Sequence, residues 1–497
     1  MQKKQVYYIL LFLIIFLSVF LRFHKITYRD FWYDEAFTGV IIKWDWHTMM
    51  NGLIRDVHPP LYYLLLKPWA SIFNYSVWGL RGFSAVFGIA TVILAFLLVK
   101  RIFKSWPLAL ITGFVIAIAP FNIQYAQEAR MYSLFGFLML CAIYFFYSSF
   151  STHKWRNSIL WALFFGLAIN THYLSFFMAP LFYLAFIFLR NAPQILDNNW
   201  KTKLRRITLR FLPDKYFFVS IGIIILTLLP WLKVLIKHLT KHSLGWIPPA
   251  HFSDLPRTIQ IFFFGSPPGM SGVPEPSAFK YLFFPDSLGL LIYSLILVLI
   301  FIFWLRNKTR IDNSKKLILL LSIFSFGLPV VLIIASHFKI YLYVSRYFAP
   351  SAIVMQILLV ALLWKVLNRK VVLAFVGIYV LLIFNLNIPP VNHNFQLLPK
   401  FLKEKNLENA KIYALDPGEF TILRYYLDPE QVYLFNKNNP NEDFSGWVSV
   451  GNEKRITKVE DLLQDKTGVI VGKIEVLEKE TERVGQVGSL EVYQIKR

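Results

Sequence analysis

Residues 6–21 read VYYILLFLIIFLSVFL, an apolar run that approaches the roughly 17–25 residues needed to cross a bilayer. The basic stretch Met1–Lys4 precedes this run, and Arg22-Phe-His-Lys follows it without a small-residue cleavage site. A signal peptide would be removed at such a site. We therefore interpret the run as an uncleaved first membrane span.

Ten further apolar runs follow along the chain. They lie near residues 80–100, 106–121, 131–150, 157–170, 172–190, 216–232, 286–305, 317–335, 347–366 and 371–388. The short pair 157–170 and 172–190 can also form a re-entrant hairpin. The chain is 56% hydrophobic with a mean hydropathy of +0.50, which is too apolar for a soluble globular protein. The fold class predicted is an all-α polytopic membrane protein with about eleven transmembrane helices.

The net charge of +23 comes mainly from short basic segments between the apolar runs. If every run crosses the membrane, these segments share one side: Lys3/Lys4, Lys100/Arg101/Lys104, Lys154/Arg156, Lys201–Arg210, Arg306–Lys316 and Arg369/Lys370. Basic loops mark the cytoplasmic side, so we expect a multi-pass protein of the cytoplasmic membrane, with its N-terminus inside and membrane lipids around it. The positive charge therefore does not indicate a nucleic-acid partner.

The composition changes to mixed polar and charged residues from about Asn392. Short β-rich runs then alternate with helix-like segments, and these runs begin at Lys411, Gln431, Gly468 and Leu490. We predict a transmembrane domain at 1–391, with interfacial helices in the first outer loop (23–79). A small extracytoplasmic α/β domain is predicted at 392–497.

Polar and ionisable residues collect at the predicted outer ends of the spans, whereas the span centres are almost free of charge. They are Asp34, Glu35, Asp56, His58, Gln124, Gln127, Glu128, Arg130, Asn170, His172 and Arg346. A lipid or glycan flippase or transporter is the main alternative function, but a transporter usually places ionisable groups near the middle of the membrane. A polar rim suits chemistry on an amphiphile whose tail stays in lipid.

Two adjacent carboxylates follow the first span in Arg29-Asp-Phe-Trp-Tyr-Asp34-Glu35. A carboxylate partly desolvated by neighbouring aromatic rings can act as a general base on an acceptor hydroxyl. The same pair also fits solvated loop charges, or acids that begin a helix. Both interpretations remain open from the pattern alone.

A second motif, Asp56-Val-His58-Pro59-Pro60, precedes an apolar segment that is too short to span. The paired prolines fix the backbone and would aim Asp56 and His58 in a defined direction. A helix start built from Asp and Pro would look much the same.

A third motif, Gln127-Glu128-Ala-Arg130-Met-Tyr132, lies in a short polar loop at 121–130 and the start of the next span. A guanidinium matches phosphate oxygens in bidentate fashion, so Arg130 is a candidate phosphate ligand. Arg346-Tyr347 at the outer start of a late span offers a second cation. Either arginine could instead reach lipid headgroups, and Arg130 could form a salt bridge with Glu128.

Taken in order, these motifs resemble the glycosyltransferase-C membrane enzymes, specifically the protein O-mannosyltransferase and lipid A aminoarabinose transferase superfamily. The resemblance covers about residues 6–390. It implies a polyprenyl-phosphate-linked sugar as donor and inverting transfer to a hydroxyl acceptor outside the cytoplasmic membrane. It also implies that Asp34 is the base, that Glu35 is its neighbour in the site, and that Arg130 and Arg346 bind the donor phosphate.

The resemblance leaves the metal and the acceptor open. Some relatives use a divalent cation near the acidic residues, and Asp34, Glu35 and Glu128 could supply oxygen ligands to Mg or Mn. Protein, lipid and glycan acceptors all fit the resemblance. A third possible function is a scaffold for polysaccharide assembly in which 392–497 binds a partner.

Overall fold

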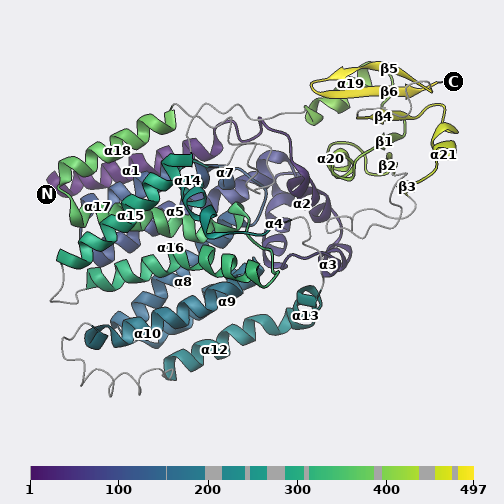
Figure 1. Cartoon of the computed structure of the whole chain (residues 1–497). Helices are drawn as coiled ribbons and strands as arrows, with labels where there is room; N and C mark the ends of the chain where they lie inside the picture. The colour runs from purple at the N-terminus through teal and green to yellow at the C-terminus, as the bar shows by residue number, and fades with distance from the viewer. Residues whose placement is uncertain are drawn as a thin grey trace. The chain divides into compact units, whose positions relative to one another are not determined.

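The computed structural model describes residues 2–152, 154–195, 215–240, 247–265, 286–306, 313–384, 394–435, 454–472 and 480–496 (Figure 1). The chain divides into two compact units, and each is discontinuous in sequence. Met1–His24 and Ser84–Ile388 form the first, here called the helical unit. Lys25–Phe83 and Pro389–Arg497 form the second, the mixed unit. The predicted first outer loop therefore belongs to the same unit as the C-terminal domain.

The helical unit is built from long apolar helices and short 3-10 turns. They are α1 (Gln2–Phe23), α5 (Val77–Phe103, which begins in the mixed unit), α6 (Trp106–Ile118), α7 (Pro120–Ala126), α8 (Tyr132–Thr152), α9 (Trp155–Ile169), η1 (Tyr173–Met178), α10 (Ala179–Ile195), α12 (Lys215–Leu228), η2 (Leu229–Trp231), α13 (Leu232–Thr240), η3 (Phe252–Asp254), α14 (Leu255–Phe264), α15 (Asp286–Arg306), α16 (Asn313–His337), η5 (Ser345–Phe348), α17 (Ala349–Val366) and α18 (Arg369–Phe384). Helices satisfy their own backbone groups, which lipid cannot do.

Eight helical segments in the described ranges are long and apolar enough to cross a membrane, and a bent pair would make nine. The bent pair is α6 and α7, which correspond to the predicted run 106–121 and meet at 58°. α9 has only 15 residues, and α18 has 16. A multi-pass helical membrane protein is confirmed, while the count of eleven spans stays a prediction. The basic cluster Lys201–Arg210 lies outside the described residues.

The apolar α17 occupies the interior of the helical unit, with 89% of its most apolar window buried. It packs against α6, α8, α14, α15 and α16. A helix that is hydrophobic all round is stable only where neighbours or lipid cover every face. Most of its residues are apolar, so a buried polar side chain on it, Gln356, stands out.

The bend between α6 and α7 follows from Pro120. Proline has no backbone N–H, so the carbonyl of Ile116 cannot receive the usual helical hydrogen bond from that position. Residues 120–126 then start a new helix, which corrects the expectation that 121–130 is all loop: only the part after Ala126 is irregular. Carbonyl groups at the end of α6 are therefore left for other donors.

The N-terminal part of the mixed unit contains three short helices, α2 (Tyr33–Lys43), α3 (Trp46–Arg55) and α4 (Leu61–Ile72). Asp45 caps α3, since its carboxylate accepts hydrogen bonds from the backbone N–H groups of His47 and Thr48. α4 contains Pro68 and is too short to span a bilayer, as the sequence predicted.

The C-terminal part of the mixed unit is a six-stranded sheet in the order β3-β2-β1-β4-β6-β5. The strands are β1 (Ile412–Ala414), β2 (Val432–Phe435), β3 (Arg455–Ile456), β4 (Val469–Val471), β5 (Thr481–Val487) and β6 (Leu490–Ile495). β1 to β4 pair in parallel, and β5 and β6 add an antiparallel edge. All four predicted β-rich runs are strands, whereas β3 and β5 were not predicted.

Helices cover both faces of this sheet (Figure 1). They are η6 (Phe395–Leu397), α19 (Leu398–Glu404), α20 (Pro417–Tyr426) and α21 (Val459–Leu463). α19 and α20 pack on one face through Leu402, Phe420 and Leu423, and α21 packs on the other through Leu462. The small α/β architecture predicted for 392–497 is confirmed.

Candidate active site

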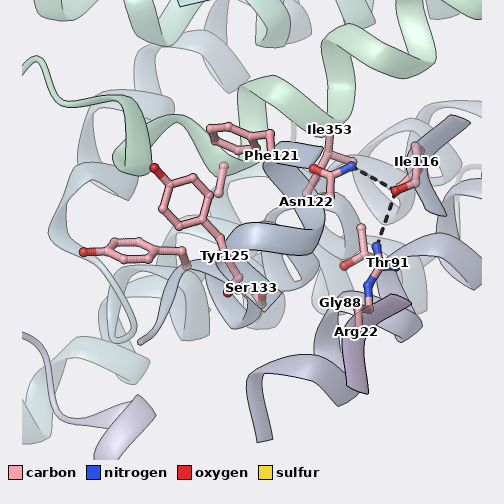
Figure 2. Close-up of a pocket in the computed structure, with 11 residues that line it drawn as sticks. Arg22, Gly88, Thr91, Ile116, Phe121, Asn122, Tyr125, Ser133 and Ile353 are labelled. Atoms are coloured by element: carbon pink, nitrogen blue, oxygen red, sulfur yellow. Dashed lines mark hydrogen bonds between the residues drawn. The ribbon is translucent and has the colours of Figure 1, made fainter. Parts of the chain in front are cut away.

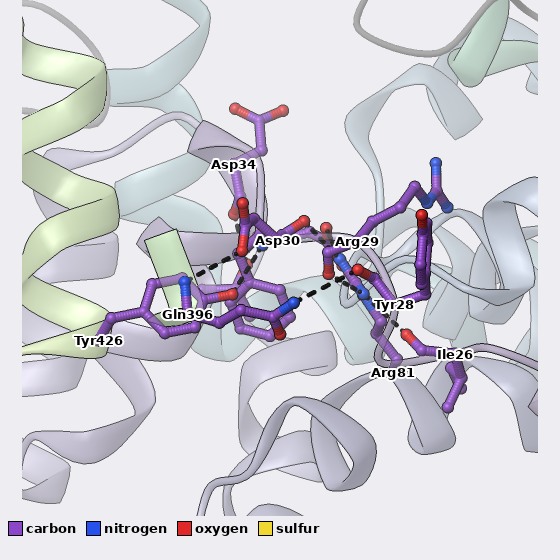
Figure 3. A network of polar contacts seen from close by, with 11 residues as sticks. Ile26, Tyr28, Arg29, Asp30, Asp34, Arg81, Gln396 and Tyr426 are labelled. Atoms are coloured by element: carbon purple, nitrogen blue, oxygen red, sulfur yellow. Dashed lines mark hydrogen bonds and ion pairs between the residues drawn. The ribbon is translucent and has the colours of Figure 1, made fainter. Parts of the chain in front are cut away.

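Asp34 and Glu35 lie in the first turn of α2, where the partial positive charge of a helix N-terminus favours carboxylates. Their side chains differ in environment. Asp34 is half-buried, and Figure 3 shows its carboxylate pointing away from the polar network below it. The Glu35 side chain is only 1% exposed. The two adjacent acids therefore occupy two distinct places.

A buried ion pair with Arg81 accounts for the position of Glu35. Arg81 Nε and Nη2 donate to the two carboxylate oxygens of Glu35 at 2.8 and 2.7 Å. The remaining N–H groups of Arg81 donate to the carbonyl oxygens of Ile26, Arg29 and Asp30 at 2.7–2.9 Å. All five guanidinium donors are thus used. Arg81 fixes the loop before α2 and the first turn of α2 at once.

The C-terminal end of α2 is held by a second buried cation. Lys67 of α4 donates to the carbonyl oxygens of Ile42 and Trp44, which a helix end leaves without intrahelical partners. Burial lowers the pKa of Lys67, and the charge of Asp45 opposes that shift. Hence α2 is anchored at both ends by residues outside it.

Asp56 and His58 form a close pair, with His58 Nδ1 and Asp56 Oδ2 2.7 Å apart. The Asp56 side chain is 2% exposed and that of His58 is 22% exposed. Pro59 and Pro60 are buried and lead directly into α4. A carboxylate that binds Nδ1 orients the imidazole ring, so the paired prolines and Asp56 together present His58.

In the helical unit, side chains from α1 and from the α6–α7 region bond each other's free carbonyl groups. Arg22 of α1 donates to the carbonyl oxygens of Ala117 (3.0 Å) and Ile116 (3.4 Å), which the bend at Pro120 leaves without helical donors. Figure 2 shows the bond to Ile116. In return, Gln127 Nε2 donates to the carbonyl oxygens at the end of α1, Leu21 and His24, both at 3.0 Å. The amide hydrogens of Gln127 therefore serve the fold.

A small pocket lies beside this junction (Figure 2). It is lined by Arg22, Gly88, Thr91, Ile116, Phe121, Asn122, Tyr125, Tyr132, Ser133, Ala349 and Ile353. Asn122 Nδ2 donates both to the carbonyl oxygen of Ile116 and to Gln356 of α17, and Gln356 donates to the carbonyl oxygen of Phe262 at the end of α14. Amide side chains thus connect α7, α17 and α14.

The start of α8 lies close to η5, where the late span begins. The rings of Tyr132 and Tyr347 lie 6.4 Å apart, and His172 contacts both. The guanidinium of Arg346 lies 5.4 Å from the Tyr347 ring. An aromatic cluster with a cation beside it can bind the charged and polar parts of one ligand.

Arg130 and Glu128 of the same loop are buried, at 1% and 6% exposure. The backbone of Arg130 is fixed because Ser84 Oγ donates to its carbonyl oxygen at 3.0 Å. Burial strengthens the electrostatic interaction between a guanidinium and a neighbouring anion.

The predicted site residues divide between the two units. Asp34, Glu35, Asp56 and His58 belong to the mixed unit, and Gln127, Glu128, Arg130, Tyr132, Arg346 and Tyr347 belong to the helical unit. The convergence of Asp34 with Arg130 and Arg346 stays a prediction.

The predicted divalent cation also stays a prediction, with one ligand fewer. Both oxygens of Glu35 are occupied by Arg81, so Glu35 does not fit as a ligand in this arrangement. Within the described ranges, no three His, Cys, Asp or Glu side chains are grouped closely enough to hold a metal ion.

Arg22, Lys67 and Arg81 were not selected from the sequence. A visible signal was available for Arg81, an arginine at the outer end of the predicted span 80–100, and for Arg22 at the end of the first span. Charged residues at such depths are costly unless they bind specific partners. Their partners lie far away in sequence, and a single sequence does not reveal them.

Comparisons with known proteins agree with this fold. Residues 57–210 match the family described as dolichyl-phosphate-mannose-protein mannosyltransferase. The chain is 28% identical over 205 residues to the putative mannosyltransferase YkcB of Bacillus subtilis (strain 168), covering 38% of this chain and 28% of that protein. It is 28% identical over 193 residues to an uncharacterized protein of Aquifex aeolicus (strain VF5), covering 37% and 39%. The chain thus spans less than half the length of these curated relatives.

Among solved structures, the fold is similar to that of apo ArnT from Cupriavidus metallidurans, with a TM-score of 0.51 and 12% identity over 99% of this chain and 97% of ArnT. The structure of the same protein bound to undecaprenyl phosphate gives a TM-score of 0.50 and 13% identity, covering 97% of each chain. At such identity the likeness shows a shared fold. The family match covers residues 57–210, and the likeness to ArnT extends the shared fold over nearly the whole chain.

Proposed function

We propose that the chain is a membrane glycosyltransferase that moves a sugar from a polyprenyl-phosphate-linked donor to a hydroxyl acceptor on the extracytoplasmic side. The reaction inverts the anomeric centre, and Asp34 is the general base. The acceptor approaches from the aqueous side, and the lipid donor approaches from the membrane.

The different environments of the Asp34 and Glu35 side chains carry this proposal. Arg81 neutralises Glu35, so the half-buried Asp34 is the acid of the pair that is placed to exchange a proton with a substrate. The donor class is supported by the family match and by the similar fold of ArnT, which was solved with undecaprenyl phosphate.

The proposed step balances as a single displacement. Asp34 takes the proton of the acceptor hydroxyl while the hydroxyl oxygen forms a bond to the anomeric carbon of the sugar. The bond from that carbon to the phosphate oxygen breaks. The electron pair leaves with the polyprenyl phosphate, whose added negative charge Arg130 and Arg346 stabilise. His58, oriented by Asp56, hydrogen-bonds the acceptor. Each charged hydrogen bond contributes about 1.5–3 kcal/mol.

The test uses purified full-length protein and detergent-solubilised membranes from a host strain that lacks the chain, since these supply natural donors and acceptors. Mass spectrometry follows the conversion of polyprenyl-phosphate sugars to free polyprenyl phosphate. We expect conversion by the wild type and a loss of at least about 100-fold for Asp34→Asn, in the range typical of a removed general base.

Asp45→Asn is the matched control, because it makes the same change at an exposed acid that caps α3 and lies eleven positions from Asp34 in sequence. It should retain activity. Unchanged turnover in Asp34→Asn would reject the base assignment. Absence of donor consumption by the wild type would favour the flippase or transporter, which needs two compartments and does not cleave its lipid.

A further inference from the structure

One face of α2 is covered by α20 of the C-terminal sheet. Gly39 faces the ring of Tyr425 so closely that an added Cβ would lie 2.6 Å from Cδ2 of that ring. The rings of Phe31 and Tyr425 are 4.5 Å apart. Only glycine permits this approach of the two helices at position 39.

Hydrogen bonds connect the loop before α2 to the same domain (Figure 3). The Asp30 carboxylate accepts from the backbone N–H groups of Phe395 and Gln396 at 3.0 and 3.1 Å, at the start of η6. The backbone N–H of Phe31 donates to the hydroxyl of Tyr426 at 2.9 Å. Arg81 binds the carbonyl groups of this loop, so the loop is held through its carbonyls on one side and through Asp30 and Phe31 on the other.

The contact continues to the end of α2. Lys43 Nζ donates to the carbonyl oxygen of Tyr425 at 3.1 Å and lies 4.2 Å from the centre of the Tyr425 ring. Burial lowers the pKa of Lys43. The Tyr425 hydroxyl donates to the carbonyl oxygen of Tyr75, beyond α4. Tyr425 therefore joins α2 to the segment that follows α4.

Helix length makes this contact necessary. α2 has 11 residues, and isolated helices shorter than roughly 12–15 residues are marginal in water. Its stability must come from packing, and the contacts at Phe31, Gly39 and Lys43 lie on both sides of Asp34 in sequence.

From these contacts we infer that the C-terminal α/β domain is a positioning element of the active site, in which Tyr425, Tyr426 and Asp30 set the orientation of α2 and thereby of the Asp34 carboxylate. The inference rests on the proposed role of Asp34. A misplacement of about 1 Å in a reacting group can cost on the order of 100-fold in rate. Small changes at the α2–α20 contact should therefore lower turnover.

Two variants test the inference by different means. Tyr426→Phe removes only the hydroxyl that accepts from Phe31, and Gly39→Ala forces α20 away from α2 while it improves intrinsic helix propensity. We expect kcat to fall about tenfold in each, with the KM for the natural lipid donor within about twofold of the wild type, because positioning acts on the transition state.

Tyr413→Phe is the matched control. It removes a hydroxyl that donates to Asp465 at 2.7 Å on the sheet face covered by α21, away from α20. This change disturbs the C-terminal domain to a similar extent without touching α2, so kcat should stay within about twofold. An equal loss of kcat in Tyr413→Phe and Tyr426→Phe would overturn the inference in favour of general destabilisation.

Asp34→Asn is measured in parallel to separate the two proposals. If Asp34→Asn is inactive but Tyr426→Phe turns over at the wild-type rate, the positioning role is wrong and the proposed function stands. A raised KM for the donor with unchanged kcat in Tyr426→Phe would also overturn the positioning role, since that pattern reports a change in donor binding. If Asp34→Asn is fully active, both proposals fail.

Discussion

Replacing Arg81 with methionine tests the buried ion pair with Glu35. The change keeps side-chain length but leaves a carboxylate, 1% exposed, without its bidentate partner, and three backbone carbonyls lose their donor. Breaking a buried pair in this way typically costs about 3–5 kcal/mol. For a folding unit of 150–250 residues, roughly 2–4 °C of thermal midpoint corresponds to each kcal/mol. The expected loss is therefore roughly 6–20 °C.

A double-mutant cycle isolates the pair from the carbonyl contacts. Glu35→Met alone should also destabilise the protein, because it leaves the Arg81 guanidinium buried without the carboxylate that neutralises it. In the double variant no charge remains unpaired, so it should be more stable than Arg81→Met alone. Thermal midpoints are measured at one fixed scan rate on the full chain in detergent. Losses in the double variant that equal the sum of the single losses would show no coupling and refute the reasoning.

Two further predictions concern stability in each unit. In Gly88→Ala the new Cβ would lie 2.7 Å from Ala126 Cβ and 2.9 Å from Arg22 Nε, so overpacking should cost about 1–3 kcal/mol of stability. Gly113→Ala is the control, because its nearest atom lies at 3.7 Å and the thermal midpoint should change little. Similar thermal midpoints for the two variants would contradict this prediction. Burial and the neighbouring charge of Asp416 raise the pKa of Glu419 to about 7, so the folded state holds a proton that the unfolded state releases at lower pH. The contribution of Glu419 to stability should therefore be greatest at low pH. It should fall by about 2 kcal/mol, allowing for solvent screening, as the pH rises from about 4.5 to 7. Midpoints measured across that range should fall less in Glu419→Gln, and parallel curves would exclude Glu419 as the source.

The helical fold could be predicted from the sequence because lipid cannot hydrogen-bond the backbone. Each span must therefore form its backbone hydrogen bonds internally, so the length of an apolar run alone predicts a helix. The four β-rich runs were predictable for a similar local reason, because short runs of β-branched and aromatic residues indicate strands. The bend in run 106–121 had a visible cause in Pro120, yet apolarity continues through it and masks the break. β3 has two residues and β5 is mostly polar, so neither shows an apolar pattern.

Long-range partners could not be predicted. The bonds from Arg81 to Glu35, from Arg22 to Ala117 and from Tyr426 to Phe31 join residues that are 46, 95 and 395 positions apart. No periodicity or spacing carries that information, so the sequence predicts neither the partner of Glu35 nor the partners of Gln127. The structure gives the side chains of both residues partners within the fold.

The discontinuous mixed unit has a consequence for biogenesis. Lys25–Phe83 emerges early from the ribosome, but Pro389–Arg497 follows only after Ser84–Ile388 has been synthesised and inserted. At roughly 5–20 residues per second, the early segment waits on the order of 15–60 s for the surface that covers Phe31 and Gly39. Until then the early segment lacks its contacts with α20, and factors that shield it should improve the yield of folded protein.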